Sequence, residues 1–228
     1  MLHTKVWIAS YKDNDGKEQR YLTDLNDLHT WYSRLVRSAN TSISPEMKVL
    51  TDSLVNGLKT DEERLKAVYY WVQDHVKYVA FEEGYMGLIP HNPSDVFKKR
   101  YGDCKDKSLL LKTMLHIAGL EAHLTWIGTR ALPYRFSELP CSGSADHMIL
   151  TWYNAAGKPL FLDATNTFLS WKLPSIAIQE KEAMVDTDSL RYTIEKVPVI
   201  APEVNLTRSE EQRLNSSHSD RSRMPSSA

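Results

Sequence analysis

The sequence is poor in cysteine, and this scarcity excludes domains that depend on disulfides or structural zinc. Only Cys104 and Cys141 occur among the 228 residues, so the chain has neither a disulfide framework nor a CxxC pair that could hold zinc. One bridge between the two cysteines would consume the best-placed thiol in the chain. We therefore expect both cysteines to be free thiols.

Net charge and long apolar runs are also lacking. Lys and Arg together number 28 against 29 Asp and Glu, so no basic excess indicates a nucleic-acid partner and no acidic run indicates a solvating tail. The apolar stretches are shorter than the roughly 18 residues of a membrane helix, and no basic segment followed by an apolar one opens the chain. We expect no nucleic-acid partner, no membrane segment and no export signal in this chain, and these features leave its compartment undetermined.

Helical spacing of apolar residues dominates the first half of the chain. It predicts one helix beginning near Asp24, a second after Pro45, and a third after Thr60, whose spacing from Glu63 is that of a capping box. A fourth helix is expected to begin at Cys104. The segment before this fourth helix is an aromatic stretch interrupted by Gly and Pro, and loops of this length in a compact domain are often functional.

Strand patterns dominate the second half. Residues 121–129 read as a strand, residues 147–153 and 159–163 as the two arms of a hairpin, and residues 183–204 as one or two further strands. Near the N-terminus, residues 3–11 also alternate in a way that suits a strand. The pattern as a whole indicates a mixed α and β domain.

The most informative stretch is residues 100–111, in which a Gly-Asp turn leads into Cys104 and then into an amphipathic helix. At a helix start, unpaired backbone N–H groups and the positive end of the helix dipole favour a negative sulfur. Lys105 and Lys107 add positive charge nearby. Cys104 is therefore a candidate nucleophile, and a half-buried structural cysteine is the ordinary alternative unless partners are found.

The predicted hairpin supplies such partners. A turn centred on Ala155 pairs residues whose numbers sum to 310, which places His147 directly opposite Asp163. The carboxylate could then accept the imidazole N–H and fix the tautomer, leaving the other ring nitrogen to face a thiol. Taken singly, this His would be an ordinary surface or core residue and this Asp an ordinary turn residue.

Together the three residues match the nucleophile, base and orienting group that covalent catalysis by cysteine requires. The backbone N–H of Cys104 is a natural donor to the oxyanion of a tetrahedral intermediate. A second donor is expected from the preceding loop, where the candidates are Tyr85, His91 and Asn92. The same three residues could instead form a metal site, but they are too few as ligands and no second Cys–His cluster accompanies them.

Four segments resemble the bacterial transglutaminase-like superfamily. They are the YGDCKDKSLLL run at 101–111, the helix exit GLEA at 119–122, the strand start at 146–147 and the strand end FLDAT at 161–165. Within the superfamily, the resemblance points to large bacterial proteins in which this domain follows an N-terminal β-rich domain of unknown function. It covers roughly residues 58–173.

The resemblance implies an α+β, papain-like fold with a helical N-terminal part, in which the Cys-bearing helix packs on an antiparallel sheet. It implies Cys104 as nucleophile, His147 as base and Asp163 as orienter. The family transfers acyl groups from a glutamine side chain or peptide amide to an amine or to water, and it needs no metal or other cofactor for this chemistry. At Ser144-Ala145 the chain departs from the Phe-Asn expected before the histidine.

The domain organisation follows from the same resemblance. We interpret residues 1–22 as the end of a preceding β-rich domain or a linker strand, and residues 23–204 as the transglutaminase-like domain, with its core at 58–173. Residues 205–228 are rich in Ser, Arg, Glu and Asn, and we interpret them as a disordered polar tail of native or cloning origin.

The leading hypothesis is a cysteine-dependent acyl transferase that acts on a protein or peptide amide through a thioester. A peptidase or amidase with the same triad, in which water resolves the thioester, is the first alternative. A non-catalytic interaction module that keeps the fold is the second. Relatives of this kind are often exported or periplasmic, and a missing N-terminal β-rich domain is an expected partner.

Overall fold

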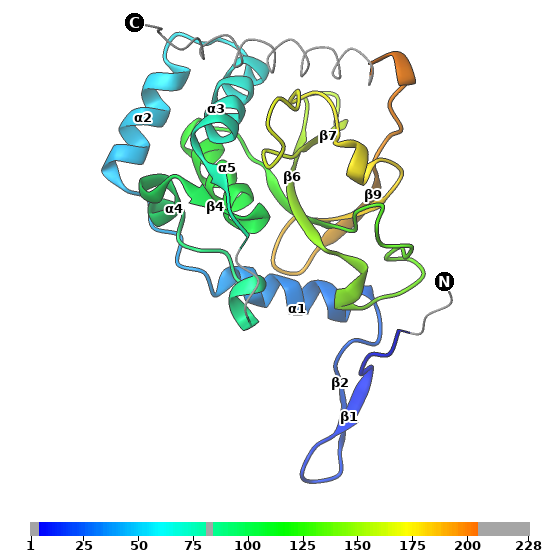
Figure 1. Ribbon diagram of the computed structural model, residues 1–228. Coiled ribbons are helices and arrows are strands. Elements are labelled where there is room, and N and C mark those ends of the chain that lie inside the picture. Colours follow the sequence, from blue (N-terminus) through cyan, green and yellow to red (C-terminus); the bar gives the residue numbers. More distant parts are fainter. Residues whose placement is uncertain (1–4, 81–83, 205–228) are drawn as a thin grey trace, which may run out of the picture.

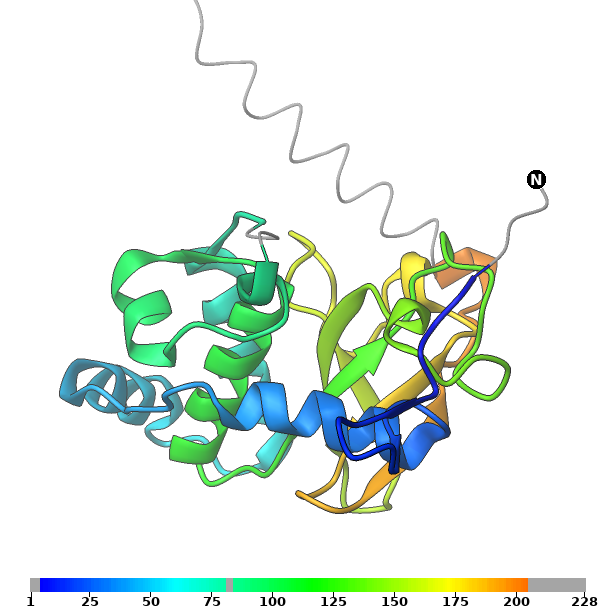
Figure 2. The same cartoon turned by 90° about the horizontal axis from the view of Figure 1, so that it is seen from below.

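The computed structural model describes residues 5–80 and 84–204, with helices on one side and a curled antiparallel sheet on the other (Figures 1 and 2). This architecture confirms the predicted α+β class. The first helix, α1 (Leu25–Arg37), runs along the side of both layers. The predicted disorder of residues 205–228 concerns a segment outside the described residues.

Local capping explains why the sequence predicts the helix starts. Asp24 accepts hydrogen bonds from two backbone N–H groups in the first turn of α1, and Thr60 forms the predicted capping box with Glu63. Gly119, with a φ of 76°, ends the Cys104 helix as expected. The remaining helices are α2 (Pro45–Val55), α3 (Asp61–His75), α4 (Pro93–Lys99) and α5 (Cys104–Ile117), with short 3₁₀ turns η1 (Gly84–Gly87), η2 (Ser142–Ser144) and η3 (Ile176–Ile178).

The main sheet has five strands in the order β7-β6-β5-β8-β9, and all neighbours are antiparallel. Its strands are β5 (His123–Ile127), β6 (His147–Tyr153), β7 (Pro159–Leu162), β8 (Glu182–Asp186) and β9 (Tyr192–Lys196). Two small sheets pair β1 (Ser10–Lys12) with β2 (Glu18–Arg20), and β3 (Lys77–Tyr78) with β4 (Tyr101–Gly102). The β3–β4 pair joins the end of α3 to the turn that leads into α5.

The predicted N-terminal strand is shorter than expected. Strand β1 begins at Ser10 rather than at residue 3, and residues 3 and 4 of the predicted strand lie outside the described part. The side chains of Val6 and Ile8 are 88% and 61% exposed, so the alternating pattern has no buried surface to face in the described part of the chain. The β1–β2 hairpin projects away from both layers (Figure 1).

The register of the β6–β7 hairpin differs from the predicted one by two residues. Leu150 pairs with Leu162, so the numbers of paired residues sum to 312 rather than 310. The cause lies in the turn, where Asn154 Oδ1 accepts hydrogen bonds from the backbone N–H groups of Ala156 and Lys158 at 3.0 and 2.9 Å. The loop is therefore centred on Ala156. A shift of two preserves which face each side chain occupies.

The core lies between the helices and the sheet. Helix α5 packs on β6 and is covered by α2, α3 and α4. The largest fully buried side chains of α5 belong to Leu110, Leu111, Met114 and Leu115. A smaller cluster, centred on Ile149 and Phe161, covers the other face of the sheet. This packing places the start of α5 beside the start of β6 and the end of β7.

Candidate active site

The start of α5 is built by a local capping box. Asp103 Oδ1 accepts from the N–H of Asp106, and Asp106 Oδ2 accepts from the N–H of Asp103, both at 3.2 Å. Gly102 is required just before it, because a Cβ there would lie 2.7 Å from Cβ of Asp106. Cys104 is the first residue of the helix and is partly exposed. The turn therefore holds the sulfur at the helix N-terminus, as the sequence predicts.

The two lysines that follow Cys104 are both buried, and they have different surroundings. Lys105 forms an ion pair with Asp103 and lines the cavity at Cys104. Lys107 points away and donates to the carbonyl oxygen of Val76 at 2.6 Å. Burial lowers the pKa of Lys107 to about 8, against the opposing charges of Asp163 and Asp74. Of these two lysines, only Lys105 therefore adds a charge to the cavity wall.

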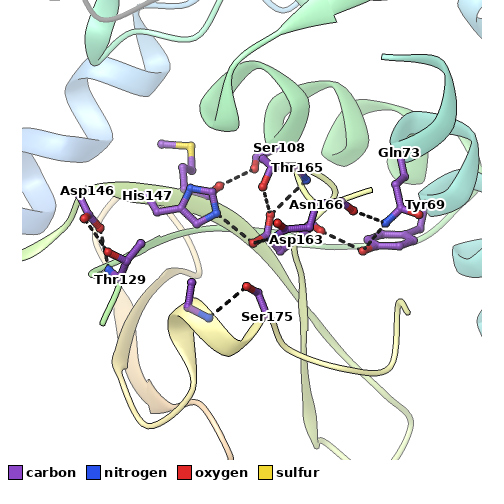
Figure 3. Close-up of polar contacts among 12 residues, drawn as sticks. Tyr69, Gln73, Ser108, Thr129, Asp146, His147, Asp163, Thr165, Asn166 and Ser175 are labelled. Atoms are coloured by element: carbon purple, nitrogen blue, oxygen red, sulfur yellow. Dashed lines mark hydrogen bonds and ion pairs between the residues drawn. The ribbon is translucent and has the colours of Figure 1, made fainter. Parts of the chain in front are cut away.

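His147 and Asp163 meet across the hairpin. The His147 Nε2 and Asp163 Oδ2 atoms are 3.1 Å apart, and the Asp163 side chain is almost fully buried (Figure 3). With the observed register the two residues are diagonal rather than direct neighbours, which is still within reach of a histidine. The predicted opposition of His147 and Asp163 is therefore wrong in register, although the contact forms.

Donors from the loop after β7 complete the shell of the Asp163 carboxylate. Thr165 donates to Oδ1 from its backbone N–H at 3.1 Å and from its hydroxyl at 2.5 Å. Asn166 Nδ2 donates to Oδ2 at 3.2 Å. The sequence offers no signal for these contacts beyond the polar character of the loop. They hold the carboxylate in place from the side opposite His147 (Figure 3).

The electrostatics of the pair favour a charged imidazole. Burial alone would lower the pKa of His147, but hydrogen bonds with Asp163 and Cys104 outweigh burial and raise the pKa to about 10. Burial would raise the pKa of Asp163, yet its hydrogen bond with His147 and the imidazolium charge lower it. Because Nε2 faces Asp163, Nδ1 is the ring nitrogen left for Cys104. The structure thus brings Cys104, His147 and Asp163 together.

The structure does not bring the two described candidates for a second oxyanion donor to this site. The backbone N–H and Nδ1 of His91 contact the Asp106 carboxylate, at 2.8 and 3.0 Å, and the ring borders a separate hollow beside α4. Asn92 caps α4 by accepting from Ser94 N–H at 2.9 Å, and it also pairs with Ser42. The side chain of Tyr85 lies outside the described part of the chain.

A cavity of about 130 Å³ opens beside Cys104 and His147. Its floor includes Tyr32 and Trp126, which stack with ring centroids 4.7 Å apart, and Leu88 and Asp146 stand at its rim. Sequence reasoning places Tyr32 on the apolar side of its helix and does not identify it as part of a site, because a stacked aromatic at helical spacing looks like any core residue.

A larger cavity, of about 470 Å³, lies elsewhere, between α1 and the second half of α5. Its lining includes Arg37, Lys112 and Asp186 but neither Cys104 nor His147. The larger cavity is therefore not the one that contains the sulfur and the imidazole.

Among the described residues, the two cysteines belong to neither a disulfide nor a metal site. Cys104 and Cys141 are both free thiols. Within residues 5–80 and 84–204, no three side chains of His, Cys, Asp or Glu are grouped so that they could hold a metal ion. None of the described helices combines the length and the apolar character needed to cross a membrane.

Together, the fold and the helix-borne cysteine beside a sheet-borne histidine define a papain-like α+β domain. Residues 48–150 match the model of the transglutaminase-like superfamily. This match confirms, for that part of the chain, the resemblance seen in the sequence. No curated protein sequence matches the chain.

Solved structures that resemble the chain share little sequence with it. A "putative protease" from Parabacteroides distasonis ATCC 8503 has a TM-score of 0.57 at 11% identity, covering 86% of this chain and 36% of its own. A "putative cysteine protease" from Cytophaga hutchinsonii has a TM-score of 0.41 at 16% identity, covering 53% and 37%. Calcium-bound LapG of Legionella pneumophila has a TM-score of 0.44 at 13% identity, covering 80% and 98%. The chain spans little more than a third of the length of the first two.

Proposed function

We propose that this domain is a cysteine-dependent enzyme that transfers an acyl group from a protein or peptide amide through a thioester on Cys104. The observation that carries the proposal is one imidazole, that of His147, hydrogen-bonded on one side to a buried carboxylate and on the other to a thiol at a helix N-terminus. These are the three roles of nucleophile, base and orienter.

The chemistry follows from the protonation states of the pair. His147 takes the thiol proton, and the sulfur attacks the amide carbon to form a carbon–sulfur bond while the carbonyl oxygen becomes negative. The N–H of Cys104, at the start of α5, is available to stabilise that oxygen. Collapse of the intermediate breaks the carbon–nitrogen bond, and the imidazolium gives its proton to the departing nitrogen. Asp163 stabilises the imidazolium throughout.

The thioester is then resolved by a second nucleophile. An amine yields a new amide, which is transamidation, whereas water yields a carboxylic acid, which is hydrolysis. In either case His147 takes a proton from the acceptor, and the thiol is regenerated. The small apolar cavity beside Cys104 would hold part of the acyl donor or acceptor.

Hydrolysis is the second candidate function. The solved neighbour from Parabacteroides distasonis is described as a protease, although the likeness to it is one of fold. Because the chain spans about a third of that neighbour, the activity and partners of a longer protein belong to the proposal as well. A preceding β-rich domain, consistent with the projecting β1–β2 hairpin, is one such partner.

A product analysis separates the two reactions. The protein would be incubated with a glutamine-containing peptide, with and without a primary amine, and the products weighed by mass spectrometry. Transamidation adds the amine with loss of ammonia, side-chain hydrolysis converts glutamine to glutamate, and peptidase action yields fragments. A Cys104→Ala variant is the control for each product. Product formed equally by this variant would contradict the proposal.

The non-catalytic alternative has its own test. A triad cysteine reacts with iodoacetamide even at low pH, and that reactivity depends on its histidine. An alkylation profile that resembles an unperturbed thiol, with a midpoint of roughly 8.5, and that does not change in His147→Ala would favour a module that keeps the fold without the chemistry.

A further inference from the structure

Nucleophile and base belong to different layers of this domain. Cys104 is carried by α5 in the helical layer, whereas His147 and Asp163 are carried by β6 and the end of β7 in the sheet. The distance between sulfur and imidazole therefore depends on how the layers are placed against each other. Apolar packing between them is strong but non-directional, whereas hydrogen bonds constrain direction as well as distance.

One hydrogen bond joins the layers directly behind the Cys104–His147 pair. Ser108, one helical turn after Cys104, donates from Oγ to the carbonyl oxygen of Met148 at 3.0 Å, and Met148 follows His147 in β6. Both residues are buried, so the bond is shielded from water. It links the turn that carries the nucleophile to the backbone that carries the base.

A second set of hydrogen bonds joins α3 to the backbone around Asp163. The Tyr69 hydroxyl donates to the carbonyl oxygen of Asp163 at 2.9 Å. Gln73, one turn later on the same face, donates from Nε2 to the carbonyl oxygens of Asn166 and Leu169 at 2.8 and 2.9 Å. Tyr69 and Gln73 are buried, and Figure 3 shows both side chains directed at this loop.

The loop that these residues hold is the one that holds the carboxylate. Asn166 donates to Asp163 Oδ2 with its side chain while its own carbonyl accepts from Gln73. The loop also contains Phe168 with a φ of 66°, a left-handed conformation that a bulky residue adopts only when its surroundings impose it. Gln73 fixes carbonyls on both sides of this residue.

We infer that Ser108, Tyr69 and Gln73 are positioning residues, which lock the sheet-borne His147 and Asp163 against the helix-borne Cys104 through hydrogen bonds to main-chain carbonyls. The hydrogen bonds that carry the inference go to main-chain carbonyl oxygens and not to the reacting atoms. The inference deepens the proposed function and rests on it. If the role of these hydrogen bonds were structural alone, they would stabilise the fold without affecting the reactivity of the thiol.

The groups that set the charge at His147 come from every neighbouring element. Asp163 and Cys104 contact the ring. Lys105 from α5 and Asp146 before β6 line the same cavity as the ring. Lys107 interacts electrostatically with Asp163. The variants Ser108→Ala and Tyr69→Phe remove none of these charges, so a change in reactivity would report a change in geometry.

The test is the rate of Cys104 alkylation by iodoacetamide between about pH 5 and about pH 9, with peptide mapping to separate Cys104 from Cys141. We expect Ser108→Ala and Tyr69→Phe each to lower the rate at the acidic end by about three- to tenfold, the equivalent of one net hydrogen bond. Matched controls are Thr125→Val, which removes the buried hydrogen bond between the hydroxyls of Thr125 and Thr151 within the sheet, and Tyr153→Phe, at the far end of β6. Both controls should keep the wild-type profile.

Two outcomes separate this inference from the proposed function. If the wild-type profile does not depend on His147, as judged by His147→Ala, the proposed function fails and the inference fails with it. If the profile depends on His147 but Ser108→Ala and Tyr69→Phe only lower the melting temperature and leave the profile unchanged, the inference alone is overturned. Should Tyr69→Phe fail to fold, Ser108→Ala decides by itself.

Discussion

Replacing Asp163 by asparagine, which keeps the size of the side chain, is expected to exchange the donor and acceptor nitrogens of the His147 ring. The carboxylate accepts from Thr165 on one oxygen and from Asn166 and His147 on the other. An amide has only one oxygen. If that oxygen accepts from Thr165, the NH₂ group faces His147 Nε2, which must then accept and leave the ring proton on Nδ1. In that tautomer His147 cannot take a proton from Cys104.

The size of the effect follows from the charge that is lost. Hydrogen bonds to Asp163 and Cys104 hold the pKa of His147 at about 10, and without the carboxylate it should fall toward its ordinary 6.5. A charge-assisted hydrogen bond contributes about 1.5–3 kcal/mol, which corresponds to a loss of about 10- to 150-fold in the reactive ion pair. Turnover should fall further, by roughly 10⁴-fold, as it does when other triads hold the wrong tautomer.

Stability should change in a definite pH window. The folded state raises the pKa of His147 above 6.5, so this contribution is complete below pH 6.5 and is lost as the pH rises toward about 10. The lowered pKa of Asp163 contributes stability above its ordinary 3.8, and that part is lost as the pH falls. In Asp163→Asn the decline above pH 6.5 should become shallower. Below about pH 8, Lys107 has little effect on this decline in stability. Above about pH 8, the titration of Lys107 makes stability rise with pH and so opposes the decline.

Urea unfolding on both sides of this window, together with alkylation rates, tests the argument. Asp188→Asn is the matched control, because Asp188 lies in an exposed turn and pairs with Arg191 rather than with a histidine. If Asp163→Asn keeps both the wild-type alkylation rate and the wild-type slope of stability against pH, the reasoning about His147 is wrong.

Three further variants test other parts of the site. Cys104→Ala should abolish labelling and product formation while leaving the melting temperature nearly unchanged, because the side chain is partly exposed. Cys141→Ser should keep labelling and product formation. If Cys141→Ser abolished them and Cys104→Ala did not, the reactive thiol would be Cys141. Lys107→Met removes a buried ammonium whose lowered pKa opposes the His147-dependent decline in stability above about pH 8. In urea unfolding the decline should therefore continue toward about pH 10 in this variant, and a decline that still levels off as in the wild type would point to another group. Gly102→Ala would place a Cβ 2.7 Å from Cβ of Asp106 and should cost about 1–3 kcal/mol in unfolding free energy, whereas a negligible loss would show that the capping box can shift.

The sequence by itself determined the features that depend on near neighbours in the chain. The start of α3 at Thr60 and the position of Cys104 at the head of α5 follow from capping residues within four positions. The periodicity of the second half likewise located β6 at its observed bounds. These interactions are local, so a single sequence contains both partners and their spacing.

The tertiary structure alone decided how these elements meet. The hairpin register depended on hydrogen bonds inside the turn at Asn154. The predicted register was wrong by two residues, and the His147–Asp163 contact survives this error because a shift of two keeps both side chains on the same face of the sheet. His91 and Asn92 looked equally suited to an oxyanion site until their contacts with Asp106 and Ser94 were seen.

Tyr69 is another residue whose contacts could not be predicted from the sequence. Its hydroxyl reaches the backbone of Asp163, which lies 94 residues away in the sequence. From the sequence alone Tyr69 is one apolar position in the stripe of α3, and nothing local indicates its partner. Contacts between distant segments depend on how the layers pack. For that reason the place of Cys104 at a helix start could be predicted from the sequence, whereas the hydrogen bond between Tyr69 and the backbone of Asp163 could not.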